Sequence, residues 1–311
     1  MAIKRTRVDT CAWGRVNSDC NGLNSTGTGK FSFMTLSKVL LLAIVSVFLG
    51  SPVNSVTVPQ QPANRGEGPA DQPMPRGDQN SMIAHAELLE KKKKGRIDLY
   101  FEGDSITRRW GTSDEQYKDF LANWRQNFFG WNAANFGWGG DRTQNILWRL
   151  NNGELDDVNP KVIVLLAGTN NVGNKSPESN DDPRVADITR GIRAILDVFQ
   201  AKAPKATIIL IGITPRNDNM AVMPIITEIN KRIAKFADGK KIRFLDLNDR
   251  MADKDGKLFE GMTNKDGLHL ALKGYQVWAD ALKPILTELL GPPAKEDYAP
   301  PPTGDPSARR P

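Results

Sequence analysis

Four short polar segments carry residue types that together could transfer an acyl group. In chain order they read GDSIT (103–107), GWGGD (137–141), GTNN (168–171) and DGLH (266–269). A serine hydroxyl becomes a nucleophile when an imidazole removes its proton and a carboxylate orients that imidazole. The oxyanion that then forms requires N–H donors aimed at it. The segments supply one candidate for each task, namely Ser105, His269, Asp266, Gly140 and Asn170.

The histidine count makes this combination more specific than its members. The chain has two histidines, and His85 lies in the linker region before the globular body, so His269 is the one histidine within that body. Asp266 stands three residues earlier, so the two side chains can lie close together in one turn. Taken singly, the candidates have simpler interpretations: Ser105 as a helix N-cap, Asn170 as an Asx turn and the glycines as turn residues.

Strand and helix patterns alternate through the part of the chain that must position these residues. Continuous apolar runs, typical of parallel strands buried on both faces, occur at 97–101, 133–136, 162–167, 206–213 and 242–247. Helical spacing of apolar residues occurs at 117–124, 146–150, 188–199, 225–233 and 272–290, with a kink predicted at Pro284. This alternation predicts one parallel sheet covered by helices on both faces. The first three polar segments follow predicted strands, where α/β proteins carry their working groups.

The four segments, in this order, resemble the sequence blocks of the SGNH (GDSL-like) hydrolases. More narrowly, NFGWGGDRTQNILWRLNNGELD (135–156) and KVIVLLAGTNN (161–171) resemble the catalytic subunits of brain-type platelet-activating-factor acetylhydrolase. The resemblance covers about residues 97–290. It implies an α/β fold of the flavodoxin-like kind, a three-layer α/β/α sandwich with a parallel five-stranded sheet.

The resemblance also implies a role for each candidate residue. It makes Ser105 the nucleophile, His269 the base and Asp266 the acid that orients the histidine. The backbone N–H groups of Ser105 and Gly140 and the side-chain amide of Asn170 would form the oxyanion hole. Asp246, at the end of another predicted strand, could rival Asp266, but no histidine lies near it in the sequence.

Three further positions bear on the substrate. In the acetylhydrolase-like members, the residues beside the nucleophile, the asparagine and the histidine line a small acyl pocket, and here they are Ile106, Thr169 and Leu268. The resemblance therefore implies an esterase that removes a short acyl group, acetyl above all, from an acetylated carbohydrate or a small lipid ester. Two alternatives stay open: a lysophospholipase or thioesterase acting on longer acyl chains, and a catalytically silent interaction protein on the same scaffold.

Composition and charge exclude several classes of partner. The chain has 311 residues, of which 39% are hydrophobic and 25% charged, as in ordinary globular proteins. Of the net charge of +6, residues 1–55 contribute +4, and the remaining 256 residues hold 36 basic and 34 acidic groups. Because this body is nearly neutral, it has no electrostatic footprint for nucleic acid. A small-molecule ester is the expected partner, and the sequence leaves a homodimer open.

No cofactor or metal is expected. Both cysteines, Cys11 and Cys20, lie in the first segment, which excludes thiolate metal sites and cysteine nucleophiles from the body. The glycines at 137–140 do not follow dinucleotide-binding spacing, and no Walker motif occurs. The acidic loop at 253–256 lacks the first ligand of a calcium loop.

The two ends of the chain differ from the body. The apolar core at 39–49, preceded by Lys38 and followed by small residues, predicts a signal peptide within residues 1–55. Eleven residues are too few for a bilayer span of ~20. We therefore expect a secreted or periplasmic protein, anchored to a membrane only if the segment is uncleaved. Residues 56–81 predict a disordered linker, 82–96 a short helical lead-in ending in a solvated lysine run at 91–94, 97–290 the hydrolase domain and 291–311 a disordered proline-rich tail.

Overall fold

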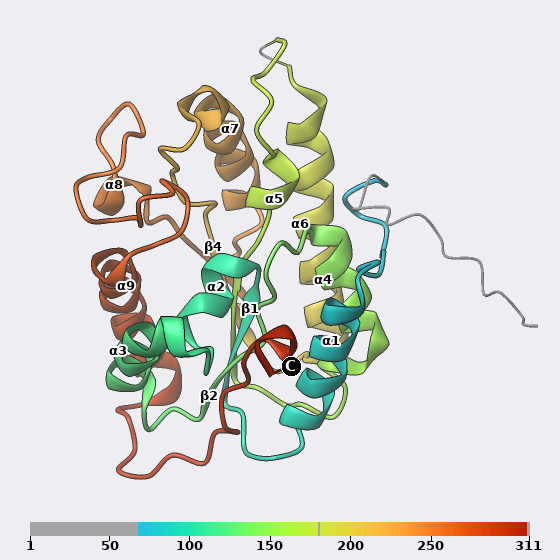
Figure 1. Cartoon of the computed structure of the whole chain (residues 1–311), viewed down its shortest axis with the longest axis vertical. Coiled ribbons are helices and arrows are strands. Elements are labelled where there is room, and N and C mark those ends of the chain that lie inside the picture. The colour runs from blue at the N-terminus through green and yellow to red at the C-terminus, as the bar shows by residue number, and fades with distance from the viewer. Residues whose placement is uncertain (1–67, 180, 310–311) are drawn as a thin grey trace, which may run out of the picture. The chain divides into compact units, whose positions relative to one another are not determined.

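The computed structural model of the protein describes residues 68–179 and 181–309, and its centre is one parallel sheet (Figure 1). The five strands are β1 (Leu99–Gly103), β2 (Ala133–Asn135), β3 (Val162–Leu166), β4 (Thr207–Ile211) and β5 (Ile242–Leu245). Their order across the sheet is β2-β1-β3-β4-β5, and every pair is parallel. This is the flavodoxin-like order, so the predicted fold class is confirmed.

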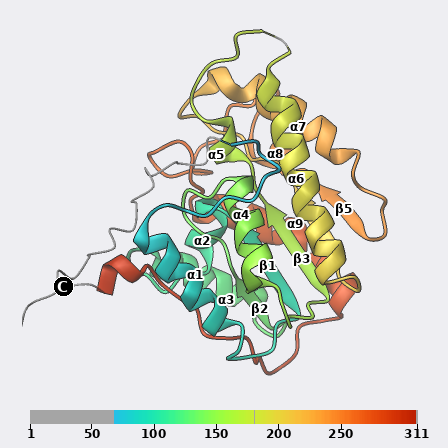
Figure 2. The same ribbon diagram turned by 90° about the vertical axis from the view of Figure 1, so that its right-hand side faces the viewer.

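Helices cover both faces of the sheet, which makes the three layers (Figures 1 and 2). Alternate strand residues, such as Tyr100 and Phe101, enter opposite cores because successive side chains of a strand point to opposite faces. The core containing Tyr100 is closed by α1 (Gln79–Lys91), α4 (Thr143–Arg149), α6 (Pro183–Lys202) and α7 (Met223–Ala234). The core containing Phe101 is closed by α2 (Ser105–Trp110), α3 (Lys118–Phe128), α8 (Asn248–Met251) and α9 (Leu272–Leu290).

Shorter elements complete the chain. Helix α5 (Thr169–Val172) follows β3, and one-turn or irregular helices lie at η1 (Glu115–Tyr117), η2 (Leu150–Glu154), η3 (Met220–Val222) and η4 (Pro306–Arg309). Helix α9 continues through Pro284 to Leu290 without interruption. No helix among residues 68–179 and 181–309 is both long and apolar enough to cross a membrane. The predicted signal segment at 39–49 lies outside the described residues.

The prediction of a disordered tail is wrong for residues 291–309. The backbone N–H of Arg96 donates to the carbonyl of Tyr298 at 2.8 Å, and the Asp297 carboxylate accepts from the N–H of Gly130 at 2.6 Å. Arg108 forms an ion pair with Asp114, whose carboxylate also accepts the Asp305 backbone N–H. Proline-rich composition predicted a free tail, but distant polar groups fix this segment against the domain.

The prediction of a linker is likewise wrong for residues 68–81. The carbonyl of Ala70 accepts from Thr143 Oγ1 at 2.8 Å, and the N–H of Met74 donates to the carbonyl of Gln144 at 3.0 Å. Helix α1 begins at Gln79, because the Asp78 carboxylate caps it by accepting the Ser81 N–H at 2.8 Å. The chain before the sheet therefore forms part of the domain.

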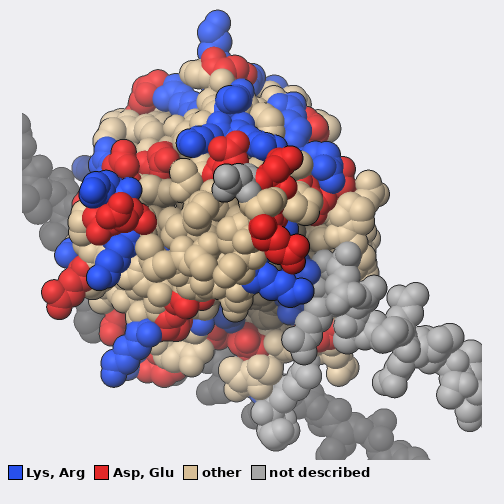
Figure 3. Space-filling view, turned by 90° about the horizontal axis from the view of Figure 1, so that it is seen from above, with Lys and Arg blue, Asp and Glu red and all other residues tan. Residues whose placement is uncertain are grey.

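Charged residues are interspersed on the surface. On the face in Figure 3, basic and acidic side chains alternate around an uncharged area, with no broad patch of one sign. The lysine run is not uniformly solvated, however, because the side chain of Lys91 points inward and is buried.

Candidate active site

The chain turns sharply from β1 into α2, and this turn presents Ser105. A Cβ on Gly103 would lie 2.3 Å from Thr107 Oγ1 and 2.4 Å from the Leu166 carbonyl, so the close approach requires glycine. The Asp104 carboxylate caps α2 by accepting the Ile106 N–H at 2.9 Å. Asp104 is thus the N-cap, and Ser105, the first residue of α2, keeps its hydroxyl available for other partners.

A turn just before α9 presents the histidine and the aspartate. One oxygen of Asp266 accepts the backbone N–H groups of Leu268 and His269, at 3.0 and 2.9 Å. The carbonyl of Gly267 accepts the N–H of Asn217 at 2.7 Å, which ties the turn to the loop after β4. An Asx-type turn therefore holds Asp266 under the imidazole ring.

The two loops bring three side chains into a hydrogen-bonded row. Ser105 Oγ lies 2.9 Å from His269 Nε2, and His269 Nδ1 lies 2.8 Å from the second carboxylate oxygen of Asp266. With Nδ1–H donating to Asp266, Nε2 carries the lone pair that accepts the serine hydroxyl. The structure thus brings together three residues that are separated by up to 164 positions. A serine hydroxyl arranged in this way can lose its proton as it attacks a carbonyl carbon.

Helix packing fixes the distance between the two loops. The Trp110 ring, at the end of α2, stacks on Tyr275 of α9 at a centroid distance of 4.9 Å. The Tyr275 hydroxyl donates to the Ile106 carbonyl at 2.7 Å. Because α2 carries Ser105 and α9 follows His269, this contact between the helices fixes the distance between the serine hydroxyl and the imidazole.

The electrostatic surroundings favour a neutral imidazole beside an ionised carboxylate. Burial raises the pKa of Asp266, but the N–H groups of Leu268 and His269 and the imidazole itself outweigh it and lower that pKa to about 2. Burial lowers the pKa of His269, and the positive charge of Arg109 lowers it further, against the opposing effect of Asp266. A neutral imidazole is the form that can accept the serine proton.

Gly140 and Asn170, the two residues beyond Ser105 that are predicted to donate to an oxyanion, belong to the glycine loop and to α5. Gly140 has a φ of 77°, a left-handed conformation that glycine adopts without strain, and it is exposed. A Cβ on Gly139 would lie 4.0 Å from Ser105 Cβ, so the glycine loop runs directly beside the serine. Asn170 Nδ2 donates to the Asp141 carbonyl at 2.8 Å, which fixes the amide against that loop.

A buried charge cluster lies behind the glycine loop. The guanidinium of Arg149 binds Asp141 at 2.8 Å, Glu102 at 2.6 Å and Glu154, and it also donates to the Phe136 carbonyl at 3.0 Å. All four charged side chains are at most 3% exposed. Burial raises the pKa of each of the three carboxyl groups, and Arg149 opposes that rise. The arginine therefore joins β1, the glycine loop and the end of α4.

Comparison with known proteins identifies the family to which the chain belongs. Residues 101–277 match the model of the GDSL-like Lipase/Acylhydrolase family. Platelet-activating factor acetylhydrolase IB subunit alpha1 of Bos taurus is 31% identical over 249 residues, which cover 77% of this chain and 98% of the relative. Subunit alpha2 of Homo sapiens is 32% identical over 225 residues, covering 69% and 86%. The chain belongs to the GDSL-like lipase/acylhydrolase family.

Solved structures agree on the fold of this GDSL-like hydrolase. A protein from Bacteroides fragilis assigned as an acylhydrolase shares 21% identity and a TM-score of 0.51, covering 68% of this chain and 98% of its own. A protein from Streptococcus pneumonia assigned as a platelet activating factor gives 24% identity and the same TM-score, covering 67% and 92%. Family membership supports hydrolysis of ester bonds.

The three predicted acyl-pocket positions are next to Ser105, Asn170 and His269 in sequence but differ in exposure. Ile106 is 1% exposed and Thr169 3% exposed, whereas Leu268 is half-buried. Their role in an acyl pocket stays a prediction. Trp138 of the glycine loop is buried, and its Nε1 donates to Ser81 Oγ at 2.8 Å. Asp246 accepts the N–H of Asn248 at 2.9 Å in a local turn.

Sequence reasoning missed two arginines of this GDSL-like site. Arg76 Nη1 donates to the Gly139 carbonyl at 2.8 Å and pairs with Asp141 at 3.2 Å, so the segment before α1 supports the glycine loop. Arg109 Nη1 lies 3.5 Å from Asp266, and its guanidinium covers the Tyr117 ring at 5.3 Å. Arg109 stands four residues after Ser105 on α2. Residues at this spacing lie on the same face of a helix, and this was the feature of the sequence that could have placed Arg109 near the serine. Among residues 68–179 and 181–309, no group of three or more His, Cys, Asp or Glu could hold a metal ion.

We expect the substitution Arg109→Gln to move the acid limb of the pH–rate profile to higher pH. The arginine disfavours protonation of His269, so its removal raises the histidine pKa, and the base is then lost at a higher pH as the pH falls. Arg109→Lys should move the limb less, because the charge stays. The measurement is kcat/KM for p-nitrophenyl acetate between pH 4 and 9. An unmoved limb, or one displaced to lower pH, contradicts this electrostatic role.

Proposed function

We propose that this protein is a serine esterase that works through an acyl-enzyme on Ser105. The observation that carries the proposal is the hydrogen-bonded row of Ser105, His269 and Asp266. His269 accepts the serine proton as Oγ attacks the ester carbonyl, and the N–H groups around the glycine loop and Asn170 stabilise the oxyanion. The protonated imidazole then gives its proton to the departing alcohol. Water, activated by the same histidine, attacks the acyl-serine and releases the acid and the free hydroxyl.

We further propose that the acyl group is short, acetyl above all. Two observations support this: the relatives that match most of the chain are named acetylhydrolases, and Ile106 and Thr169 beside the catalytic residues are too buried to leave a long open channel at those positions. An acetylated carbohydrate or a small lipid ester would present such a group. Rates with p-nitrophenyl acetate, butyrate and octanoate test the proposal. A steep fall in kcat/KM with chain length is expected, and a preference for octanoate contradicts the short acyl group.

The substitution Asn170→Ala should lower kcat by about 10²–10³ with a much smaller change in KM. The amide is proposed to stabilise charge that develops only in the transition state, so its loss affects turnover more than ground-state binding. Asn152→Ala is the matched control, because that exposed amide donates to the Trp148 carbonyl and to no other group in the part of the chain that the structure describes. Steady-state kinetics on both variants, with circular dichroism to confirm folding, provide the check. A drop in the control alone, or equal drops in both, would exclude the oxyanion role.

We propose export from the cytoplasm as the setting for this activity. The apolar core at 39–49 with its basic flank supports removal of an N-terminal signal. N-terminal sequencing of the protein from the culture medium or periplasm tests it. A mature start beyond residue 50 is expected, and a protein that retains Met1 in the cytoplasm contradicts it.

A further inference from the structure

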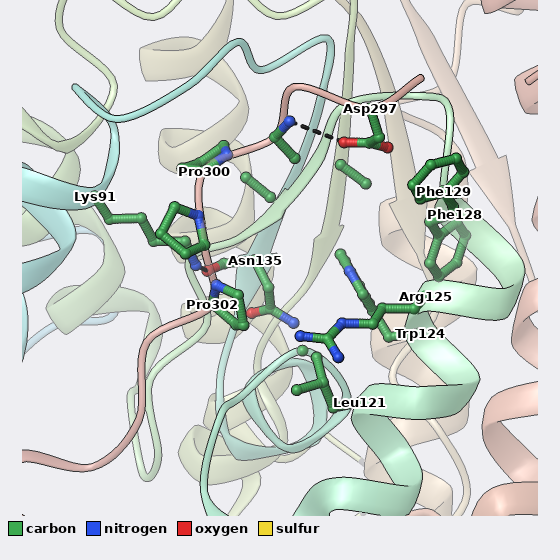
Figure 4. A pocket seen from close by; sticks show the side chains of 15 residues that line it. Lys91, Leu121, Trp124, Arg125, Phe128, Phe129, Asn135, Asp297, Pro300 and Pro302 are labelled. Atoms are coloured by element: carbon green, nitrogen blue, oxygen red, sulfur yellow. Dashed lines mark hydrogen bonds between the residues drawn. The ribbon is translucent and has the colours of Figure 1, made fainter. Parts of the chain in front are cut away.

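A cavity that is not lined by Ser105, His269 or Asp266 lies between α3, the edge strand β2 and the C-terminal segment (Figure 4). It encloses about 260 Å³, slightly smaller than typical drug-sized sites. Most of its wall is apolar and includes Leu121, Trp124, Phe128, Pro300 and Pro302. An apolar cavity of this size fits the body of a small ligand and leaves few polar groups to orient it.

One of those polar groups is the amino group of Lys91. Lys91 is 2% exposed, and Nζ donates to the Asn135 carbonyl at 2.5 Å and lies 5.1 Å from the Phe136 ring centroid. Among the described residues, no carboxylate forms an ion pair with it. Burial lowers its pKa to about 7, against the opposing effect of Glu154. A buried ammonium without a paired anion is costly, so an anion that entered the cavity would relieve that cost.

The other charged groups of the cavity favour an anion as well. Arg125 lines the cavity from α3, is exposed, and its guanidinium has no hydrogen-bond partner among the described residues. The one acidic lining residue, Asp297, already accepts the backbone N–H groups of Gly130, Asn132 and Ala299, at 2.6, 3.3 and 2.8 Å. The oxygens of Asp297 are therefore occupied by backbone N–H groups, and the lining carries two basic side chains, Lys91 and Arg125, against this one carboxylate.

We propose that this cavity binds a small monocarboxylate with an apolar body, whose carboxylate pairs with Lys91 and whose chain packs against the α3 aromatic side chains. Arg125 provides a second positive charge for the same group. The ligand lies outside the catalytic row, so its binding requires neither Ser105 nor His269.

Isothermal titration with octanoate, and with octanol as a neutral ligand of the same chain length, tests the proposal. Octanoate is expected to bind at least about tenfold more tightly than octanol, and Lys91→Met should lower its affinity about tenfold or more. Lys93→Met is the matched control, because Lys93 is an exposed residue of the same helix end that pairs with Glu90. Octanoate affinity should also fall as the pH rises from 6 to 9, because Lys91 then loses its charge.

The outcomes separate this site from the catalytic one. Octanoate binding that survives Lys91→Met places the carboxylate elsewhere, including at the serine, and overturns the proposal. Equal affinity for octanoate and octanol, or no binding at millimolar ligand, also overturns it. If Lys91→Met does not fold, two other measurements test the proposal. They are the ratio of the affinities of the native protein for octanoate and octanol, and the affinity of Arg125→Gln for each ligand. That surface variant should weaken octanoate by about twofold to fivefold and leave octanol unchanged.

Discussion

The substitution Ser105→Ala should lower the rate of p-nitrophenyl acetate hydrolysis by about 10⁴-fold or more. The Ser105 hydroxyl oxygen is the proposed nucleophile of the acyl-enzyme, and His269 and Asp266 have no hydroxyl to activate without it. The remaining rate would come from the oxyanion donors and binding alone. Removal of a half-buried hydroxyl should leave the thermal unfolding midpoint nearly unchanged.

Ser307→Ala is the control for this loss. Ser307 is an exposed residue far from the catalytic loops in sequence, and within residues 68–179 and 181–309 its hydroxyl bonds only to Asp305. The control should retain the full rate. An unaltered rate in folded Ser105→Ala would contradict the proposed mechanism outright.

The largest effect on stability should come from Arg149→Met. The substitution leaves Glu102, Asp141 and Glu154 buried without their shared cation, and breaking a buried ion pair typically costs about 3–5 kcal/mol. Since a domain is stable by only about 5–15 kcal/mol, this variant should be close to unfolding. Urea unfolding monitored by circular dichroism measures the change. Arg193→Met, which breaks an exposed pair with Asp197, should alter the free energy of unfolding by about 0.5 kcal/mol at most.

The pH dependence of the Arg149→Met deficit identifies its cause. Burial raises the pKa of the three carboxyl groups in the folded state. Above the pKa that these groups have in the unfolded chain, their buried negative charges therefore lower the free energy of unfolding, and this loss is relieved as the groups bind protons at lower pH. The deficit should therefore shrink as the pH falls from 8 to 5. Adding Glu102→Gln and Glu154→Gln should restore part of the stability at pH 8. A deficit that is independent of pH and not rescued would point to lost packing instead.

Most of the sheet could be predicted because buried parallel strands are apolar on both faces. The exception is instructive: the first strand was placed at 97–101, but β1 continues through Glu102 and Gly103. A glutamate signals the end of an apolar run, and Glu102 is buried because Arg149, 47 residues away, pairs with it and because nearby groups also donate to it. Such a partner is invisible to a local pattern.

The ends of the domain were misjudged for the same reason. Proline, glycine and polar residues at 68–78 and 291–309 predict disorder, since they bury little apolar area. These segments are instead held by several polar contacts with distant parts of the chain, such as those of Arg76 with the Gly139 carbonyl and of Asp297 with the Gly130 N–H. The lysine run at 91–94 predicts four solvated side chains, because a run of like charges gives no sign that Lys91 turns inward.

The candidate site was more predictable than its surroundings. The rare histidine and its spacing from Asp266 suggested a base and its orienting acid, and Ser105 followed from the position of its loop after a strand. Arg109 tunes the same imidazole from α2, 157 residues before Asp266. That proximity depends on how α2 packs against α9 through Trp110 and Tyr275, which spacing along the chain does not reveal.

Labelling with a fluorophosphonate, followed by peptide mass spectrometry, tests the central claim most directly. The reagent phosphonylates a serine that a neighbouring base activates, so the adduct should fall on Ser105 within the tryptic peptide 97–108. His269→Gln should slow labelling strongly while the protein stays folded. An adduct on any other residue, or no adduct on the folded native protein, would contradict an acyl-serine at this position.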